Sequence, residues 1–132
     1  MPKGEVIVTA VVPHSIDEAF ATFTNEIDRW WVRSGKRDTV VRFEGDRLVE
    51  ASPTGAETLG TVSRSEPPIR IEMDWIGPHS ETGDTVVVEF SSEGAGTRVT
   101  IRHLRPGIEN AGALSAVIGL WWGEILSRFQ HR

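Results

Sequence analysis

Hydrophobic and polar residues follow two different periods along this chain, and each change of period marks an expected element. Residues 6–11 form a β-branched run that stops before Pro13, a residue that cannot continue a central strand. Apolar residues then recur every three or four positions after Ser15, which can cap a helix together with Glu18. The pattern predicts a first strand at 6–11 and a short helix at 15–23.

The middle of the chain follows a period of two. Turn signals rich in Gly, Pro and Asp recur about every ten residues, and β-branched runs lie between them. Within residues 69–75 apolar residues alternate with charged ones, so one face of the expected sheet is dry and the other is wet. The dry face of this strand is expected to carry Ile69, Ile71, Met73 and Trp75. The six strands are expected at 39–43, 47–51, 58–65, 69–75, 85–90 and 97–104.

Two further helical segments complete the pattern. A brief turn through Ile27 and Trp30 follows the first helix, and large apolar residues recur at helical spacing near the C-terminus. The second pattern predicts a helix over about residues 110–130, roughly 30 Å long and sufficient to cover a sheet. We expect one strand, two short helices, six strands and one long helix in a single domain, residues 1–132. The apolar stripe of the long helix consists of Leu114, Val117, Ile118, Trp121, Trp122, Ile125, Leu126 and Phe129.

Composition and charge narrow the range of partners. With 39% hydrophobic and 25% charged residues, the chain has the composition of an ordinary globular protein. Its 14 basic and 19 acidic residues give a net charge of -5, which argues against a nucleic-acid partner. The absence of Cys excludes disulfides and thiolate chemistry. No apolar stretch has the length of a secretion signal or a membrane span, so we expect a cytoplasmic protein without a membrane partner.

The tryptophans are the most unusual part of the composition. Trp30 and Trp31 form one pair, Trp121 and Trp122 form another, Trp75 lies between them, and the chain has no Tyr. Indoles supply rigid apolar volume with a single N–H each, which suits the wall of an apolar pocket. Burial in a core is the commoner role for any single Trp. The sequence leaves both roles open.

Several short motifs occur in a fixed order along nearly the whole chain. They are Pro13-x-Ser15-x-x-x-Ala19-Phe20, Ile27-x-x-Trp30-Trp31, Gly60-x-Val62 followed by Pro67-Pro68, Gly96-Thr97-x-Val99-Thr100-Ile101-x-His103, and Trp122-x-x-x-Leu126. In this order and spacing they resemble the activator of Hsp90 ATPase homologue 1-like family of the START-like (SRPBCC) superfamily. The resemblance implies an α+β helix-grip fold, in which a curved antiparallel sheet of about seven strands wraps around a long C-terminal helix. This chain has Trp121 where the family usually has Gly, so indole is expected to fill part of the space above the sheet.

Candidate chemistry is sparse. Of the four His residues, only His103 is expected on an inward strand face, in register with Ile101. A lone inward His is more often a hydrogen-bonded core residue than a catalyst, so no catalytic residue is assigned. The carboxylate pairs, such as Glu50 and Glu57, are expected on wet faces or in turns. No His pair has metal-ligand spacing and no glycine-rich loop precedes a helix, so neither a metal nor another cofactor is expected.

Three functions remain open. The first is non-catalytic binding of a small hydrophobic or aromatic ligand between sheet and C-terminal helix, where Gly112, Gly119 and Gly123 leave space. The resemblance implies two others: a co-chaperone-like protein-interaction module, with a homodimer through exposed strand edges allowed, and a cyclase or hydrolase. In the enzyme, His103 would be the general base and an acid such as Glu50 would assist it. The residues expected to contact a ligand are Trp30, Trp31, Met73, Trp75, Phe90, Ile101, His103, Leu114, Ile118, Trp121 and Trp122.

Overall fold

The computed structural model describes residues 5–31, 39–76, 83–104 and 112–130, with the backbone alone for residues 29 and 112–118. Its elements follow the predicted order of one strand, two short helices, six strands and one long helix, and their boundaries differ from the expected ones by only a few residues. The elements are β1 (Glu5–Val12), α1 (Ile16–Asn25), α2 (Ile27–Trp30), β2 (Val40–Glu44), β3 (Arg47–Ser52), β4 (Gly55–Glu66), β5 (Arg70–Trp75), β6 (Thr85–Glu93), β7 (Gly96–Leu104) and α3 (Gly112–Gln130).

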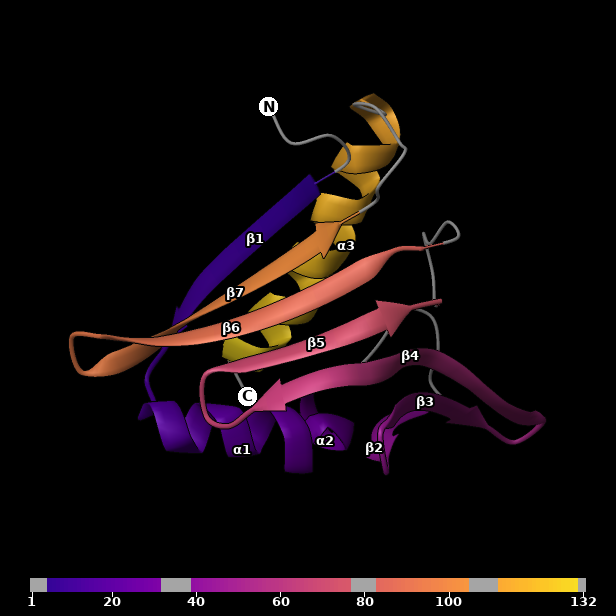
Figure 1. Ribbon diagram of the computed structural model, residues 1–132, viewed down its shortest axis with the longest axis horizontal. Coiled ribbons are helices and arrows are strands. Elements are labelled where there is room, and N and C mark those ends of the chain that lie inside the picture. The colour runs from indigo at the N-terminus through magenta and orange to yellow at the C-terminus, as the bar shows by residue number, and fades with distance from the viewer. Residues whose placement is uncertain (1–4, 32–38, 77–82, 105–111, 131–132) are drawn as a thin grey trace.

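The strands form one antiparallel sheet that curls around the last helix. Seven strands of the described chain join in the order β1-β7-β6-β5-β4-β3-β2. The register shifts between Leu48 and Val49 and between Val62 and Arg64, and such irregularities bend strands. α3 lies behind the sheet, while α1 and α2 close one end of the curl (Figure 1). The expected helix-grip architecture is therefore confirmed.

The two faces of this sheet differ as a period of two requires. The inner face, turned toward α3, carries buried side chains such as Ile101 and His103 of β7. The outer face carries ion pairs that cross the strands. Arg102 of β7 pairs with Glu5 of β1 at 2.9 Å and with Glu89 of β6 at 3.6 Å. The inner face is therefore the one on which an apolar ligand could be held.

The expected dry face of β5 needs one correction. Ile71, Met73 and Trp75 are buried on the inner face, as the alternation predicts. Ile69, however, lies before β5 and is 50% exposed. Its backbone N–H donates to the Glu66 carbonyl at 2.8 Å in the turn after β4, while its carbonyl accepts from the Phe90 N–H of β6 at 2.9 Å. Ile69 therefore lies where the turn joins β5, and its side chain is not covered.

α1 begins at the cap that the sequence predicts. The Oγ of Ser15 accepts a hydrogen bond from the backbone N–H of Glu18 at 3.3 Å and donates to the Glu18 carboxylate at 3.1 Å. At the other end, the Thr24 hydroxyl donates back to the Phe20 carbonyl at 2.9 Å, one turn earlier. α1 ends at Asn25, and α2, which follows it directly, contacts β2, so the C-terminal end of α1 lies at the β2 side of the sheet.

α3 lies mainly against β1, at one edge of the sheet. A Cβ added at Gly119 would lie 3.6 Å from Cγ1 of Val6, an ordinary contact distance. The space expected beside Gly119 is therefore occupied by β1, although nothing lies within 4 Å of a Cβ at Gly123. The side chain of Gln130 donates to the Val11 carbonyl at 2.8 Å and ties the end of α3 to β1.

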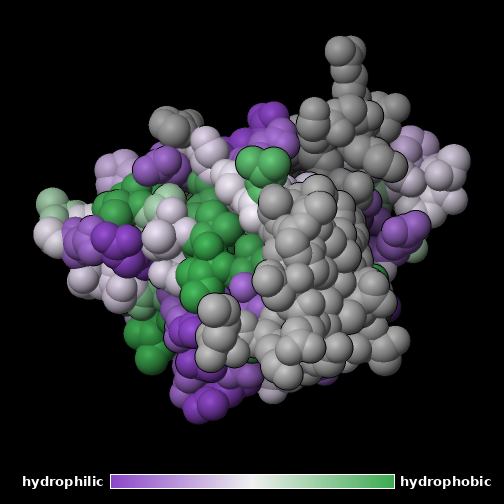
Figure 2. All heavy atoms as spheres, turned by 90° about the horizontal axis from the view of Figure 1, so that it is seen from above, coloured by the Kyte–Doolittle hydropathy of each residue, from purple (hydrophilic) through white to green (hydrophobic). Residues whose placement is uncertain are grey.

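The described surface is mixed in polarity. Figure 2 shows apolar side chains bordered by hydrophilic ones on the face seen from above. None of the described helices has the length and hydropathy needed to cross a membrane. The large apolar residues exposed in the described chain are Ile7, Val40, Ile69, Ile76 and Leu120.

Candidate functional site

An indole cluster joins the sheet to α3. Trp75 of β5 lies with its ring centroid 5.2 Å from that of Trp122 and 6.1 Å from that of Trp121, which confirms the predicted contact between these elements. Trp31, which follows α2, packs edge-on against Trp122 at 5.7 Å. Trp31, Trp75 and Trp122 are at most 2% exposed, whereas Trp121 is half-buried. Offset and edge-on ring contacts of this kind stabilise a core beyond simple area burial.

A second cluster of rings ties α1 and α2 to the end of α3. The ring centroid of Trp30 lies 4.7 Å from that of Phe129 and 5.1 Å from that of Phe23. Phe23 also packs edge-on against Phe90 of β6 at 5.7 Å. The Trp30 indole N–H donates to the Thr22 carbonyl at 3.0 Å, so its polar atom is satisfied inside the cluster. These rings therefore act as core, the role that is common for buried Trp and Phe.

His103 is the centre of a buried polar network. Its Nε2 lies 2.7 Å from Oδ2 of Asp84, and its Nδ1 accepts a hydrogen bond from the Trp122 indole at 3.0 Å. An indole nitrogen can only donate, so Nδ1 carries no proton and Nε2–H donates to Asp84. The His103 side chain is 0% exposed and that of Asp84 is 1% exposed. Both ring nitrogens are thus engaged: Nδ1 links β7 to α3, and Nε2 links it to the residue before β6.

The acid beside His103 is Asp84 and not Glu50. Glu50 lies on β3, and three strands separate β3 from β7, so the two are about 19 Å apart along the sheet at ~4.8 Å per strand. Glu50 is also only 8% exposed, so its expected solvated position was wrong. The register could have revealed Asp84, because it pairs Val86 with His103 and Asp84 precedes Val86 by two residues on the same face. The turn signal Gly83-Asp84 obscured this relation in the sequence.

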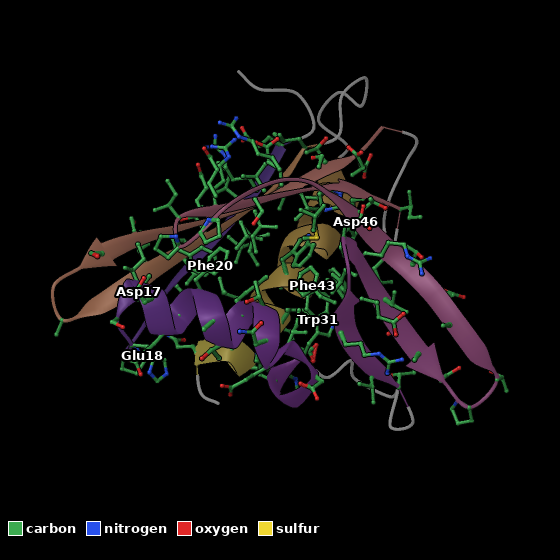
Figure 3. The ribbon with its side chains drawn as sticks, turned by 60° about the horizontal axis from the view of Figure 1, so that its bottom comes forward. Asp17, Glu18, Phe20, Trp31, Phe43 and Asp46 are labelled. Carbon is green, nitrogen blue, oxygen red and sulfur yellow. The ribbon has the colours of Figure 1, made fainter. Side chains whose placement is uncertain are left out.

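Two adjacent pockets open between the C-terminal end of α1 and the β2 side of the sheet. The larger has a volume of about 410 Å³ and the smaller about 330 Å³. Thr24, Asn25 and Phe43 line both, so the half-buried Phe43 ring stands between them. Figure 3 shows Phe43 and Trp31 in the space framed by α1 and the β2–β3 hairpin, with Asp46 beyond them on the hairpin. The larger pocket is lined by Thr24, Asn25, Phe43, Gly45, Asp46, Val62, Ser65 and Ile71.

The expected ligand-binding residues occupy a different part of the fold. None of them lines either of these two pockets. The side chains of Leu114 and Ile118 lie outside the description. The others are packed in the core, with Trp121 partly covered; they are Trp30, Trp31, Met73, Trp75, Phe90, Ile101, His103 and Trp122. A ligand contact by these residues stays a prediction.

Sequence reasoning missed the pocket residues because inward orientation alone does not distinguish a pocket residue from a packed core residue. Phe43 points inward and Arg42 outward, as β2 alternation predicts, and Arg42 pairs with Glu44 at 2.6 Å. The sequence feature that could have indicated the pocket is the small side-chain volume on the inner face of β4. Val62 is the largest inner residue that β4 directs toward this space, and Gly60 precedes it, so this strand contributes little volume.

The described residues offer no grouping of three His, Asp or Glu side chains suited to a metal ion. The chemistry of the pockets therefore comes from apolar contact and single polar groups. Such a combination is the usual composition of a small-molecule site.

The sequence matches one family model, described as Activator of Hsp90 ATPase homolog 1-like protein, over residues 13–132. No curated protein has a matching sequence. Among solved structures, the AHSA1-like protein from Aeromonas hydrophila is 23% identical with a TM-score of 0.68, over 96% of this chain and 90% of that one. CalU16 from Micromonospora echinospora is 20% identical with a TM-score of 0.65, over 94% of this chain and 72% of that one.

A third neighbour is the Aha1 dimer from Colwellia psychrerythraea. It is 14% identical with a TM-score of 0.65, over 96% of this chain and 92% of that one. At these identities the neighbours show that the fold is shared and nothing about ligands.

Proposed function

The chain belongs to the activator of Hsp90 ATPase homolog 1-like family, and on this premise we propose that it binds a small apolar molecule without transforming it. The family and the fold are those of ligand-binding or interaction modules in general. The ligand would lie in the larger pocket, between the end of α1 and strands β2, β4 and β5. The cytoplasmic location expected from the sequence stays a prediction.

The observation that carries this proposal is the pocket itself. Its volume of about 410 Å³ lies within the range of roughly 300–1,000 Å³ that is typical of small-molecule sites. The side chains of Phe43, Val62 and Ile71 supply an apolar floor, and polar residues form the rim. An apolar floor with a few polar groups at its edge is the usual composition of a binding site.

The state of His103 supports binding over catalysis. A general base needs a free lone pair within reach of a substrate, and here Nδ1 accepts from Trp122 while Nε2–H donates to Asp84. The imidazole is also fully buried. The cyclase or hydrolase hypothesis would require this network to open before any proton could be taken up.

Protein interaction is the second candidate function. β2 is an edge strand of the sheet that the described residues form, and its Val40 is 42% exposed, so the strand offers an edge and an apolar side chain to a partner. The dimeric state of the Colwellia neighbour is consistent with self-association in this family. Light scattering after size-exclusion chromatography tests it. A monomer at every concentration would remove the homodimer from consideration.

A titration with 1-naphthalenemethanol, a neutral aromatic probe, tests the proposed function. Backbone ¹H–¹⁵N NMR signals of the pocket-lining residues Phe43, Asp46 and Val62 should shift, while signals of β1 should not. The variant Val62→Phe fills the pocket floor and should abolish the shifts. Val40→Phe adds the same volume on an exposed site and should leave them unchanged. Shifts centred on β1 and α3, or no shifts at all, would contradict the proposal.

A further inference from the structure

Unpaired negative charge lies around both pockets. Asp46 is on the rim of the larger pocket and Asp28 is on the rim of the smaller one, and both are exposed. Neither carboxylate forms a hydrogen bond or ion pair with another side chain in the described part of the chain. A carboxylate without a partner is available to a ligand cation at no cost of breaking an existing bond.

Among the described residues that line these pockets, the one basic side chain is neutralised. Arg42 borders the smaller pocket, and its guanidinium contacts the Glu44 carboxylate at 2.6 Å through Nη2 and 2.7 Å through Nε. A two-nitrogen contact with one carboxylate leaves little net positive charge near the pocket. Among the described residues, the unpaired charges beside the pockets are therefore those of Asp46 and Asp28.

The C-terminal end of α1 adds partial negative charge beside both pockets. Its last residues, Thr24 and Asn25, line both pockets, and the last turn of this ten-residue helix carries no basic side chain. A helix C-terminus carries a partial negative charge of about half an electron from its unpaired carbonyls. The Thr24 hydroxyl already donates to the Phe20 carbonyl, so it offers an incoming ligand only acceptor lone pairs.

The larger pocket has an aromatic and an acidic side chain in its lining, and this pair suits one class of ligand. The ring of Phe43 can contact an apolar body and also an ammonium group, and the carboxylate of Asp46 can accept its N–H bonds. The net charge of -5 favours approach of a cation in addition. We infer that the ligand is a cationic amphiphile, an apolar molecule that carries an amine; this inference rests on the proposed function.

Three probes with the same ring system test the inference. 1-Naphthylmethylamine, 1-naphthalenemethanol and 1-naphthoic acid are titrated separately, and binding is followed by the NMR signals of the pocket residues. The amine should bind about two- to fivefold more tightly than the alcohol, the range that an exposed ion pair supplies, and the acid should bind most weakly. At about 1 M salt, where the screening length is about 3 Å, the amine and the alcohol should bind alike.

Two matched variants assign the effect to the rim. Asp46→Asn keeps a residue that suits a turn and should reduce the amine to the affinity of the alcohol, with no change for the alcohol itself. Asp17→Asn removes the same charge at the opposite end of α1, where Figure 3 shows this residue far from Asp46, and should leave the amine preference intact.

The outcomes distinguish the inference of a cationic ligand from the proposal of an apolar binding pocket. Equal binding of amine and alcohol, tighter binding of the acid, or an amine preference that survives Asp46→Asn would overturn the cationic ligand but leave the apolar pocket in place. Failure of all three probes to shift the pocket residues would overturn the proposed function as well.

Discussion

The inner face of the sheet has a filled half and an open half, and the contrast between them explains where we propose that a ligand binds. In the filled half, formed by β1, β7, β6 and β5, the inner residues meet large rings from α3, as Trp75 meets Trp122. In the open half, formed by β4, β3 and β2, Phe43 and Val62 are half-buried beside the pocket. Other residues of these strands, such as Val41, Leu48 and Leu59, are buried in the core. Both halves follow the same alternation, so the difference lies in what covers them.

The position of α3 accounts for the difference. This helix lies mainly against β1, and the described ring contacts between its indoles and the sheet reach no farther than Trp75 of β5. Beyond that strand the sheet curls over α1 and α2, which are short and end near Asn25 and Trp31. α1 and α2 have 10 and 4 residues, against 19 in α3, so they span less of the sheet.

The largest expected effect is the loss of an indole in the filled half. Trp75→Ala and Trp122→Ala should each lower the free energy of unfolding by about 3 to 5 kcal/mol, because both rings are buried and close-packed. Trp121→Ala is the matched control and should cost less, since Trp121 is only half-buried. Urea titration measures all three. Equal losses for Trp121 and Trp122 would show that the filled half is not packed as described.

A smaller change tests the polar link within the filled half. Trp122→Phe keeps a ring but removes the N–H that Nδ1 of His103 accepts, which should cost about 1 to 3 kcal/mol for a buried acceptor left unpaired. The imidazole tautomer provides a second measurement. In the wild type, ¹⁵N NMR should show the proton of His103 on Nε2, facing Asp84. A proton on Nδ1 would contradict the network.

The same substitution in both halves gives the most direct comparison. Val88 of β6 is 0% exposed in the filled half, so Val88→Ala should cost about 2 kcal/mol from lost burial plus the cavity left behind. Val62 is half-buried beside the pocket, so Val62→Ala should cost about 1 kcal/mol or less. Equal losses in urea titrations would show that the open half is as tightly packed as the filled half.

The smallest effect is expected outside both halves. Arg70 of β5 pairs on the outer face with Glu72 at 2.8 Å and with Glu89 at 3.2 Å, where water screens the charges. Arg70→Gln should change the free energy of unfolding by about 1 kcal/mol or less and leave ligand binding unchanged. A larger loss in urea titration would mean that the outer face also holds the curl of the sheet.

The sequence predicts the fold well because the fold depends on periodicity. The change from period two to helical spacing locates α1 and α3, and the Ser15 cap appears where its pattern indicates. Ile69 shows the limit of this reasoning, since apolar character placed it in β5 while backbone hydrogen bonding placed it where the preceding turn joins β5.

The candidate site was harder to predict because it depends on relations between elements. His103 was identified as inward, but its partner Asp84 is brought near only by the register of β6 against β7. The pocket is harder still. Phe43 and Trp31 are both inward aromatic residues, and only the placement of α3 decides that Trp31 is covered by Trp121 and Trp122 while Phe43 borders open space.

The run of indoles has an optical consequence. Ring centroids lie 5.9 Å apart from Trp30 to Trp31, 5.7 Å from Trp31 to Trp122 and 5.2 Å from Trp122 to Trp75. At such spacings the excited states of neighbouring indoles couple, and light absorbed by one ring can be emitted by another. The near-ultraviolet circular dichroism of this protein should therefore be that of an array, and a quencher that reaches a single ring should dim the emission of its neighbours as well.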